Sequence, residues 1–283
     1  MIYTIKNEFI SLSVKKMGAE LNSIKIGERE YMWQGDPDVW AGQAPLLFPL
    51  VGPMHSKTIG GLASEMNNHG FLKETEFSLA SQSESEIVLA CQASEKTQNL
   101  YPFNFKIEVK FALVGKTVES SYTVFNNDER EMVYSFGLHP AFALDLENLK
   151  LTDYYIEFGK KETLDRCMFF DDGVSFDIKE NVVNNDTKLE FYDELLEKTI
   201  VFKDIDFSEV KFCNKKEGAL FNFKFDGFKI FAMWQKPQSA YLCLEPWLGY
   251  NGPTPHTETV EENTSVTFLE PGKSDTYKMS IEF

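Results

Sequence analysis

The sequence predicts an all-β fold, a sandwich or a barrel, from three observations. Strand-length segments that alternate apolar and polar residues recur at roughly 8–12-residue spacing, with turn-forming residues between them. Aromatic residues make up 14% of the 283 residues, and their side chains suit the pleated, half-buried surface of a sheet. Helical periodicity is weak, and the best helical candidate is a short stretch at residues 94–99.

The expected strands follow this alternation along the chain. In the first half they cover residues 9–14, 86–90, 105–111 and 118–124. The short link Gly115-Lys116 predicts a hairpin between the last two of these strands. The run Asn126-Asn127-Asp128 then predicts a turn, because these side chains hydrogen-bond their own backbone.

The second half continues the pattern. Its expected strands cover residues 198–202, 210–212, 219–225, 229–234, 240–244, 265–269 and 276–283. The pair Asp226-Gly227 predicts a tight hairpin, since Asp-Gly favours positive φ angles. Residues 145–193 are the least regular, and we expect them to form loops over one edge of the fold. Because no linker or repeat interrupts the chain, residues 1–283 are expected to form one domain.

The formal net charge of −16 limits the possible partners. A field of this sign repels phosphate backbones and anionic membranes, so we expect neither nucleic acid nor a membrane as partner. Only three of the 28 basic residues are arginine, the residue whose planar fork matches phosphate, which argues against phosphorylated substrates. A small neutral ligand fits this balance best, and we expect a monomer or a homodimer.

The cysteine pattern and the hydropathy indicate the compartment. The four cysteines form no CxxC pair and no zinc-ligand spacing, so we expect reduced thiols. The N-terminus lacks the pattern of a signal peptide, and no run approaches 18 apolar residues. These features predict a cytoplasmic protein.

Three residues are the best candidates for chemistry. His69 ends a polar stretch before a glycine, and His139 is held extended or in a turn by the proline that follows it. Glu245 ends an apolar run, and Pro246 is expected to stop that strand. A carboxyl group in a partly dry cleft gains a higher pKa and becomes a useful base. The alternative interpretations are structural histidines and a Glu245 that pairs with a surface lysine.

Three short phrases change that balance, because their order and spacing resemble signatures of the aldose 1-epimerase family. They are His69-Gly70-Phe71, Gly137-Leu138-His139-Pro140-Ala141-Phe142 and Leu244-Glu245-Pro246. The segments 32–34, 44–49 and 271–273 are similar to the LacX-like branch, so the resemblance spans nearly the whole chain. It implies a large antiparallel β-supersandwich, galactose mutarotase-like, and interconversion of the α and β anomers of a free aldose.

The resemblance also implies a role for each candidate. His139 matches the general acid that protonates the ring oxygen, and Glu245 matches the general base that takes the proton of the C1 hydroxyl. His69 matches the second histidine, which positions the sugar. This chemistry requires no cofactor, and the sequence shows no metal-ligand cluster and no glycine-rich dinucleotide loop, so we expect neither a cofactor nor a metal.

Four further residues are candidates for substrate binding. Trp40 and Trp247 are expected to stack on the apolar face of a sugar, with a place in the core as the alternative; Trp33 and Trp234 are expected in the core. The family's arginine after the LFP phrase is missing, and His55 or Lys57 can replace it or lie in a solvated loop.

The family's sugar-binding aspartate is also missing around residues 196–199, although Asp193 and Glu197 lie near.

Two other functions compete with a mutarotase for free galactose or glucose. One is a hexose-6-phosphate 1-epimerase, which the charge and the few arginines disfavour. The other is a catalytically weak sugar-binding or sensing protein. Retention of both histidines and Glu245 opposes it, because binding alone requires no acid–base pair.

Overall fold

The computed structural model describes residues 1–170, 173–192, 194–253 and 255–283, and strands dominate it. Within these residues, α-helix is limited to α1 (Glu95–Gln98), which Ser94 caps. This helix lies in the stretch 94–99 that was the best helical candidate in the sequence. Short 3₁₀ turns occur at η1 (Leu72–Glu74), η2 (Leu151–Asp153) and η3 (Val260–Glu262). The prediction of an all-β, antiparallel sandwich is therefore confirmed.

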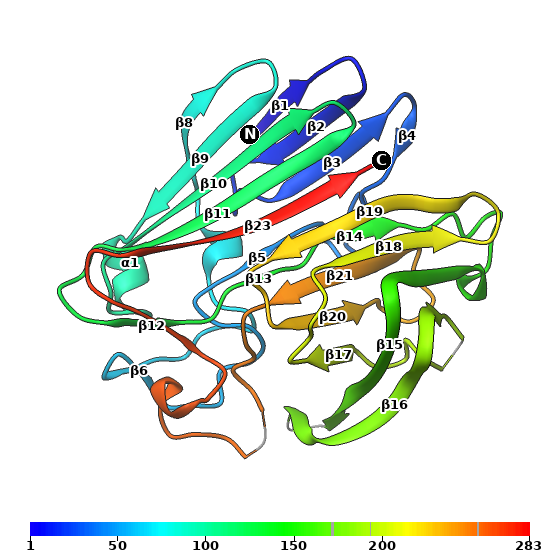
Figure 1. Ribbon diagram of the computed structural model, residues 1–283. Helices are drawn as coiled ribbons and strands as arrows, with labels where there is room; N and C mark the ends of the chain where they lie inside the picture. Colours follow the sequence, from blue (N-terminus) through cyan, green and yellow to red (C-terminus); the bar gives the residue numbers. More distant parts are fainter. Residues whose placement is uncertain (171–172, 193, 254) are drawn as a thin grey trace.

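A nine-stranded antiparallel sheet forms the front layer in Figure 1. From one edge to the other its strands are β16 (Gly173–Glu190), β15 (Tyr154–Phe170), β18 (Glu209–Asn214), β19 (Gly218–Asp226), β23 (Ser274–Glu282), β11 (Thr117–Asn126), β10 (Phe105–Val114), β9 (Glu86–Gln92) and β8 (Ser78–Gln82). In β10 the buried and partly exposed residues alternate along the strand, which explains why its period-2 pattern was readable.

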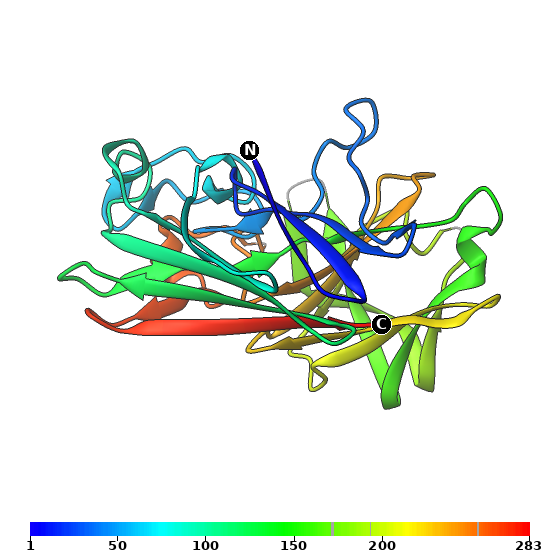
Figure 2. The ribbon, with the colours of Figure 1, turned by 90° about the horizontal axis from the view of Figure 1, so that it is seen from above.

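A six-stranded sheet lies behind this layer, as Figure 2 shows from above. Its strands are β17 (Ile200–Lys203), β20 (Ile230–Trp234), β21 (Tyr241–Trp247), β13 (Gly137–Leu138) and β5 (Leu46–Leu47), with β14 (Ala141–Ala143) also paired to β21. The apolar faces of the two layers bury one large core, rich in phenylalanine.

The N-terminal strands and two small ribbons complete the fold. They are a four-stranded sheet of β1 (Ile2–Lys6), β2 (Ile10–Lys15), β3 (Leu21–Ile26) and β4 (Arg29–Glu30), the pair β12 (Met132–Tyr134) with β22 (Thr267–Leu269), and the pair β6 (Thr58–Ile59) with β7 (Leu62–Ala63).

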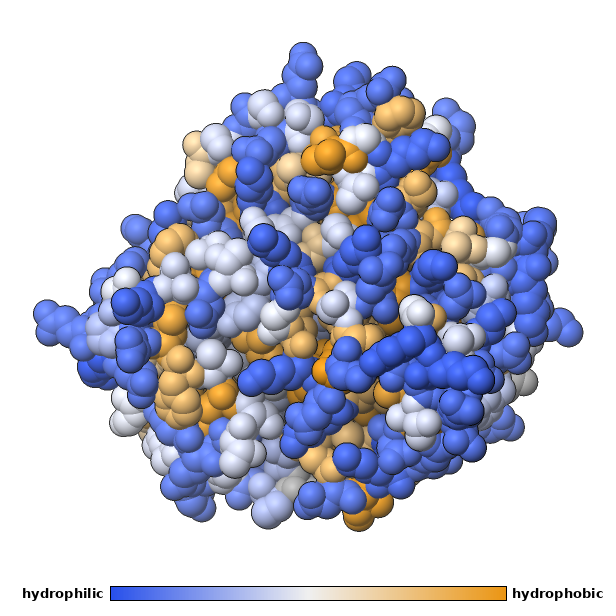
Figure 3. Space-filling model, viewed as in Figure 1, coloured by the Kyte–Doolittle hydropathy of each residue, from blue (hydrophilic) through white to orange (hydrophobic). Residues whose placement is uncertain are grey.

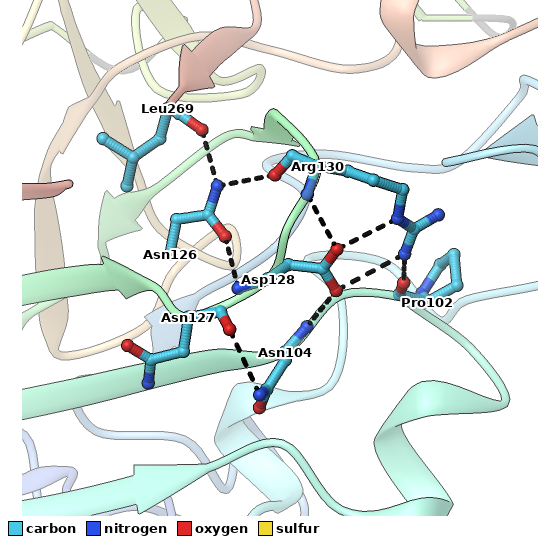
Figure 4. A network of polar contacts seen from close by, with 7 residues as sticks. All are labelled: Pro102, Asn104, Asn126, Asn127, Asp128, Arg130 and Leu269. Carbon is cyan, nitrogen blue, oxygen red and sulfur yellow. Dashed lines mark hydrogen bonds and ion pairs between the residues drawn. The ribbon is translucent and has the colours of Figure 1, made fainter. Parts of the chain in front are cut away.

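Two of the predicted turns have the expected chemistry. Gly115 has φ +58° and joins β10 to β11 as a two-residue hairpin. At the other end of β11, the Asn126 amide donates to two backbone carbonyl groups, and its oxygen accepts the N–H of Asp128 (Figure 4). The Asp128 carboxylate then pairs with Arg130, so side chains close the turn.

The turn at Asp226-Gly227 is not a hairpin, contrary to the prediction. Gly227 has the expected positive φ of +90°, but β19 pairs with β18 and β23, whereas β20 pairs with β17 and β21. The turn therefore carries the chain from the front sheet to the sheet behind it. Asp226 and Gly227 determine that the chain turns here, whereas the packing of the two layers determines which strands pair.

The described residues between 145 and 193 are not mainly loops, which corrects a second prediction. Most of them form β15 and β16, the two longest strands, which pair with each other at the edge of the front sheet. Register shifts interrupt this pairing, and the middle of β16 is exposed on both faces. These irregularities break the alternation that marks a strand in sequence.

Pro246 does not end its strand either. β21 continues to Trp247, and the N–H groups of Leu244 and Leu248 on either side of the proline both donate to backbone carbonyl groups. Pro246 itself has no N–H to donate, but the bonds made by Leu244 and Leu248 keep the strand paired.

The face of the molecule in Figure 3 is mainly hydrophilic, with apolar residues scattered among charged ones. Among the residues described, no helix has the length and apolar character needed to cross a bilayer.

Candidate active site

Strand β21 supplies one wall of the site, because its two faces have different surroundings. Leu242 and Leu244 point into the main core. By the alternation of a strand, the odd-numbered residues of β21 point to the opposite face. Those residues are Tyr241, Cys243, Glu245 and Trp247. A buried carboxyl group is thus fixed within a sheet and flanked by a thiol and an indole.

His139 lies directly opposite Glu245. It occupies the bend between β13 and β14, where the Pro140 carbonyl accepts the N–H of Leu244 and ties the bend to β21. His139 Nε2 lies 3.1 Å from Glu245 Oε2, and the two residues are only 7% and 1% exposed. The neighbouring Gly137 allows β13 to pack closely against β21, since a Cβ there would lie 2.7 Å from the Trp247 ring.

His69 completes a triangle with these two residues. Its ring lies edge-on to that of His139, with the centroids 5.7 Å apart. His69 has the left-handed φ of +68°, and Nδ1 accepts the N–H of Gly52 at 3.0 Å. That bond leaves Nε2 to carry the proton of the neutral ring. Gly70 is required beside it, because a Cβ there would lie 2.2 Å from the Phe48 carbonyl oxygen.

The three candidates share one cleft of about 740 Å³. Trp40 and Trp247, the expected stacking residues, also line it. Trp234 lines it as well, although it also packs against the small buried cluster that contains Tyr241 and Cys243; it stands edge-on to both Trp40 and His139. Trp33 packs behind this wall, where its Nε1–H donates to the Trp40 carbonyl at 2.9 Å.

Of the described residues that line the cleft, Lys73 is the one cation, and the sequence did not indicate it. Its Nζ donates to the Asn68 carbonyl at 2.7 Å. Lys57 does not line the cleft, because its exposed ammonium group pairs with Glu258 at 2.8 Å. His55 does not line it either; its ring stacks on His256, with centroids 3.9 Å apart. The prediction that His55 and Lys57 bind the substrate is therefore not supported.

Other lining residues were also missed. Thr199 lines the cleft within the segment where the family's aspartate was expected, and Asp193 lies outside the described residues. Phe169 reaches the cleft from β15, the segment expected to be loop. Of the described residues that line the cleft, none is an arginine.

Burial governs the electrostatics of the site. It raises the pKa of Glu245 well above its usual value, and the nearby Trp247 opposes the shift only in part. Burial also lowers the pKa of His139 well below its usual value, with the neighbouring His69 as the next cause. Besides the contact with His139 Nε2 at 3.1 Å and the nearby Trp247, neither oxygen of Glu245 has a hydrogen-bond partner among the described residues. The pair is therefore most stable when Glu245 is protonated and His139 is neutral. In this state Glu245 can deliver a proton and His139 can accept one.

Burial and the nearby Lys73 lower the pKa of His69 to about 4 from 6.5, and this shift predicts a pH effect on stability. Between pH 6.5 and pH 4 the His69 side chain is protonated in the unfolded chain but stays neutral in the folded protein. The free energy of unfolding therefore decreases as the pH falls from about 6.5 to about 4. We expect His69→Asn to remove up to about 3 kcal/mol of that loss. Asparagine tolerates the left-handed φ, and its side-chain oxygen can accept the Gly52 N–H.

Urea unfolding of both proteins at about pH 7 and about pH 4.5 measures this difference. Equal losses of unfolding free energy in the two proteins would contradict a buried, neutral His69.

Comparisons with known proteins identify the family and the fold. The model of the family described as aldose 1-epimerase matches residues 1–282. The plasmid-encoded protein LacX of Lactococcus lactis subsp. lactis is 29% identical over all of this chain and 98% of its own length. A galactose mutarotase related enzyme from Lactobacillus acidophilus has a TM-score of 0.92 at 25% identity, covering 100% of this chain and 97% of that one. For a galactose mutarotase-like protein from Lactobacillus casei, the TM-score is 0.88 at 22% identity, with 100% and 99% covered.

Proposed function

This chain belongs to the aldose 1-epimerase family, as an isomerase-type enzyme of its LacX-like branch, and we propose that it interconverts the α and β anomers of a free hexose such as galactose or glucose. The observation that carries this proposal is the buried pair of His139 and Glu245, 3.1 Å apart at the wall of an aromatic cleft.

The proposed reaction removes one proton from the sugar and delivers one proton to it. The single proton of the resting pair passes from Glu245 to His139, and the hydroxyl groups of the bound sugar solvate the charges that this creates. The Glu245 carboxylate then removes the proton of the C1 hydroxyl, C1 and O1 become a carbonyl group, and the bond between C1 and the ring oxygen breaks. His139 protonates the ring oxygen. Rotation about the C1–C2 bond and closure in the reverse sense give the other anomer.

The rest of the cleft has supporting roles in this proposal. Trp40 and Trp247 offer apolar surface to the C–H face of the sugar ring. His69, with Nδ1 occupied by Gly52, presents its Nε2–H as a donor toward the sugar.

A panel of sugars tests the substrate class. Polarimetry of freshly dissolved α-D-galactose, α-D-glucose and their 6-phosphates should show enzyme-dependent acceleration with the free sugars. We expect kcat/KM at least about tenfold lower for the phosphates, because no arginine lines the described cleft and its one lysine already donates to a carbonyl group.

Faster turnover of the 6-phosphates than of the free sugars would instead identify a hexose-6-phosphate epimerase. No acceleration with any of the four sugars would contradict the proposed function.

A further inference from the structure

Cys243 adds a third potential metal ligand to the catalytic pair. One ligand atom each from His139, Cys243 and Glu245 lies within 4.8 Å of the other two, and all three residues are buried. Cys243 precedes Glu245 by two residues on β21, so both side chains leave the strand on the same face. The proton transfers proposed above make no use of this thiol.

The three ligand types are those that zinc prefers. Zinc binds thiolate, imidazole and carboxylate at about 2.0–2.3 Å, which puts neighbouring donor atoms of a tetrahedral site about 3.3–3.6 Å apart. The 3.1 Å between His139 Nε2 and Glu245 Oε2 already approaches that spacing. Both oxygens of Glu245 are buried, and besides His139 and the nearby Trp247 no described residue offers them a hydrogen bond, so a bound cation would supply a further partner.

We propose that a thiophilic divalent cation such as zinc or cadmium binds between His139, Cys243 and Glu245. His139 and Glu245 line the cleft, so the cation can enter from it and keep a fourth position open to water. The Cys243 thiol loses its proton to solvent on binding, because a coordinating thiol is deprotonated by the metal charge. No electron transfer is involved.

Metal binding at this place has a consequence for turnover, which rests on the proposed function. The ligands include the acid and the base of the reaction, so a bound cation blocks both proton transfers. The site then acts as a zinc-sensitive switch, in which micromolar metal stops anomer interconversion and a chelator restores it.

Cysteine variants of the full chain test the site without any need for activity. Titration calorimetry with Zn²⁺, together with the ultraviolet charge-transfer band of thiolate-bound Cd²⁺, should show one site in the wild type. Cys243→Ala should weaken zinc binding at least about tenfold and abolish the cadmium band, as expected when a metal site loses a ligand. Cys213→Ala, which removes another buried thiol, should leave both signals unchanged.

Two results would overturn the metal site: equal zinc affinity in the wild type and Cys243→Ala, or a cadmium band that Cys213→Ala removes instead. Activity distinguishes the two proposals. Zinc binding that depends on Cys243 in a protein inactive on every sugar would keep the metal site and reject the epimerase. A protein that is active on the sugars, shows no cadmium band and is not inhibited by zinc would keep the epimerase and reject the metal site.

Discussion

Replacing Glu245 by glutamine is expected to lower kcat for anomer interconversion by about 10²–10⁴-fold. The amide has the size of the carboxyl group but cannot take the proton of the C1 hydroxyl. Folding should be little affected, because burial already disfavours the charged form of Glu245, and glutamine keeps a polar group of the same size beside His139 Nε2. Initial rates by polarimetry, with thermal unfolding recorded beside them, measure both effects.

The matched control is Glu119→Gln, which makes the same chemical change on an exposed position of β11. It should keep the wild-type kcat. A Glu245→Gln protein that retains kcat within about threefold would exclude Glu245 as the general base, since removal of a catalytic base costs at least about 10²-fold.

Replacing His139 by glutamine is expected to lower kcat by a similar factor, about 10²–10⁴-fold. Glutamine keeps a polar group of similar reach beside Glu245 but cannot deliver a proton to the ring oxygen. Sugar affinity should change little, because Trp40 and Trp247 remain in place. Titration calorimetry and polarimetry on the same sample separate the two effects.

This variant also distinguishes an enzyme from a sugar-binding protein of the same fold. A binder has no turnover to lose, and in it the substitution would change affinity alone. His256→Gln, at an exposed histidine outside the cleft, is the matched control and should leave kcat unchanged. Equal kcat in His139→Gln and the wild type would remove His139 from the mechanism.

Most of the fold could be predicted from sequence because most strands have one buried face. The alternation of β10 and β11 gave their positions, and Gly115 gave the hairpin between them. The failures occurred where alternation was absent. In β16 the exposed middle and the register shifts removed the period of two.

The residues proposed to react could be selected from the sequence, because each belongs to a short phrase whose order is specific, and the structure brings all three to one cleft. The close approach of these residues in space could not be predicted. The approach of His139 to Glu245 depends on the pairing of β14 and β13 with β21, which joins residues about a hundred positions apart. Contacts at that separation leave no local pattern in a sequence.

The lining of the cleft was the least predictable part. Lys57 and Lys73 look alike in sequence, yet one pairs with Glu258 at the surface and the other faces the cleft. The difference arises from η1, the 3₁₀ turn after Phe71, which holds Lys73 beside the His69 loop. Trp234 was only half predicted for a related reason: it packs against a small core cluster and also lines the cleft, and an aromatic residue at the end of a strand fits both places.

Exchange NMR of galactose in D₂O at anomeric equilibrium tests the central claim most directly, because it follows both anomers without any net reaction. The account predicts enzyme-dependent exchange between the α and β H1 signals, with no deuterium entering any carbon position, since ring opening breaks only the C1–oxygen bond of the ring. An absence of enzyme-dependent exchange, or deuterium found at C2, would contradict acid–base ring opening at His139 and Glu245.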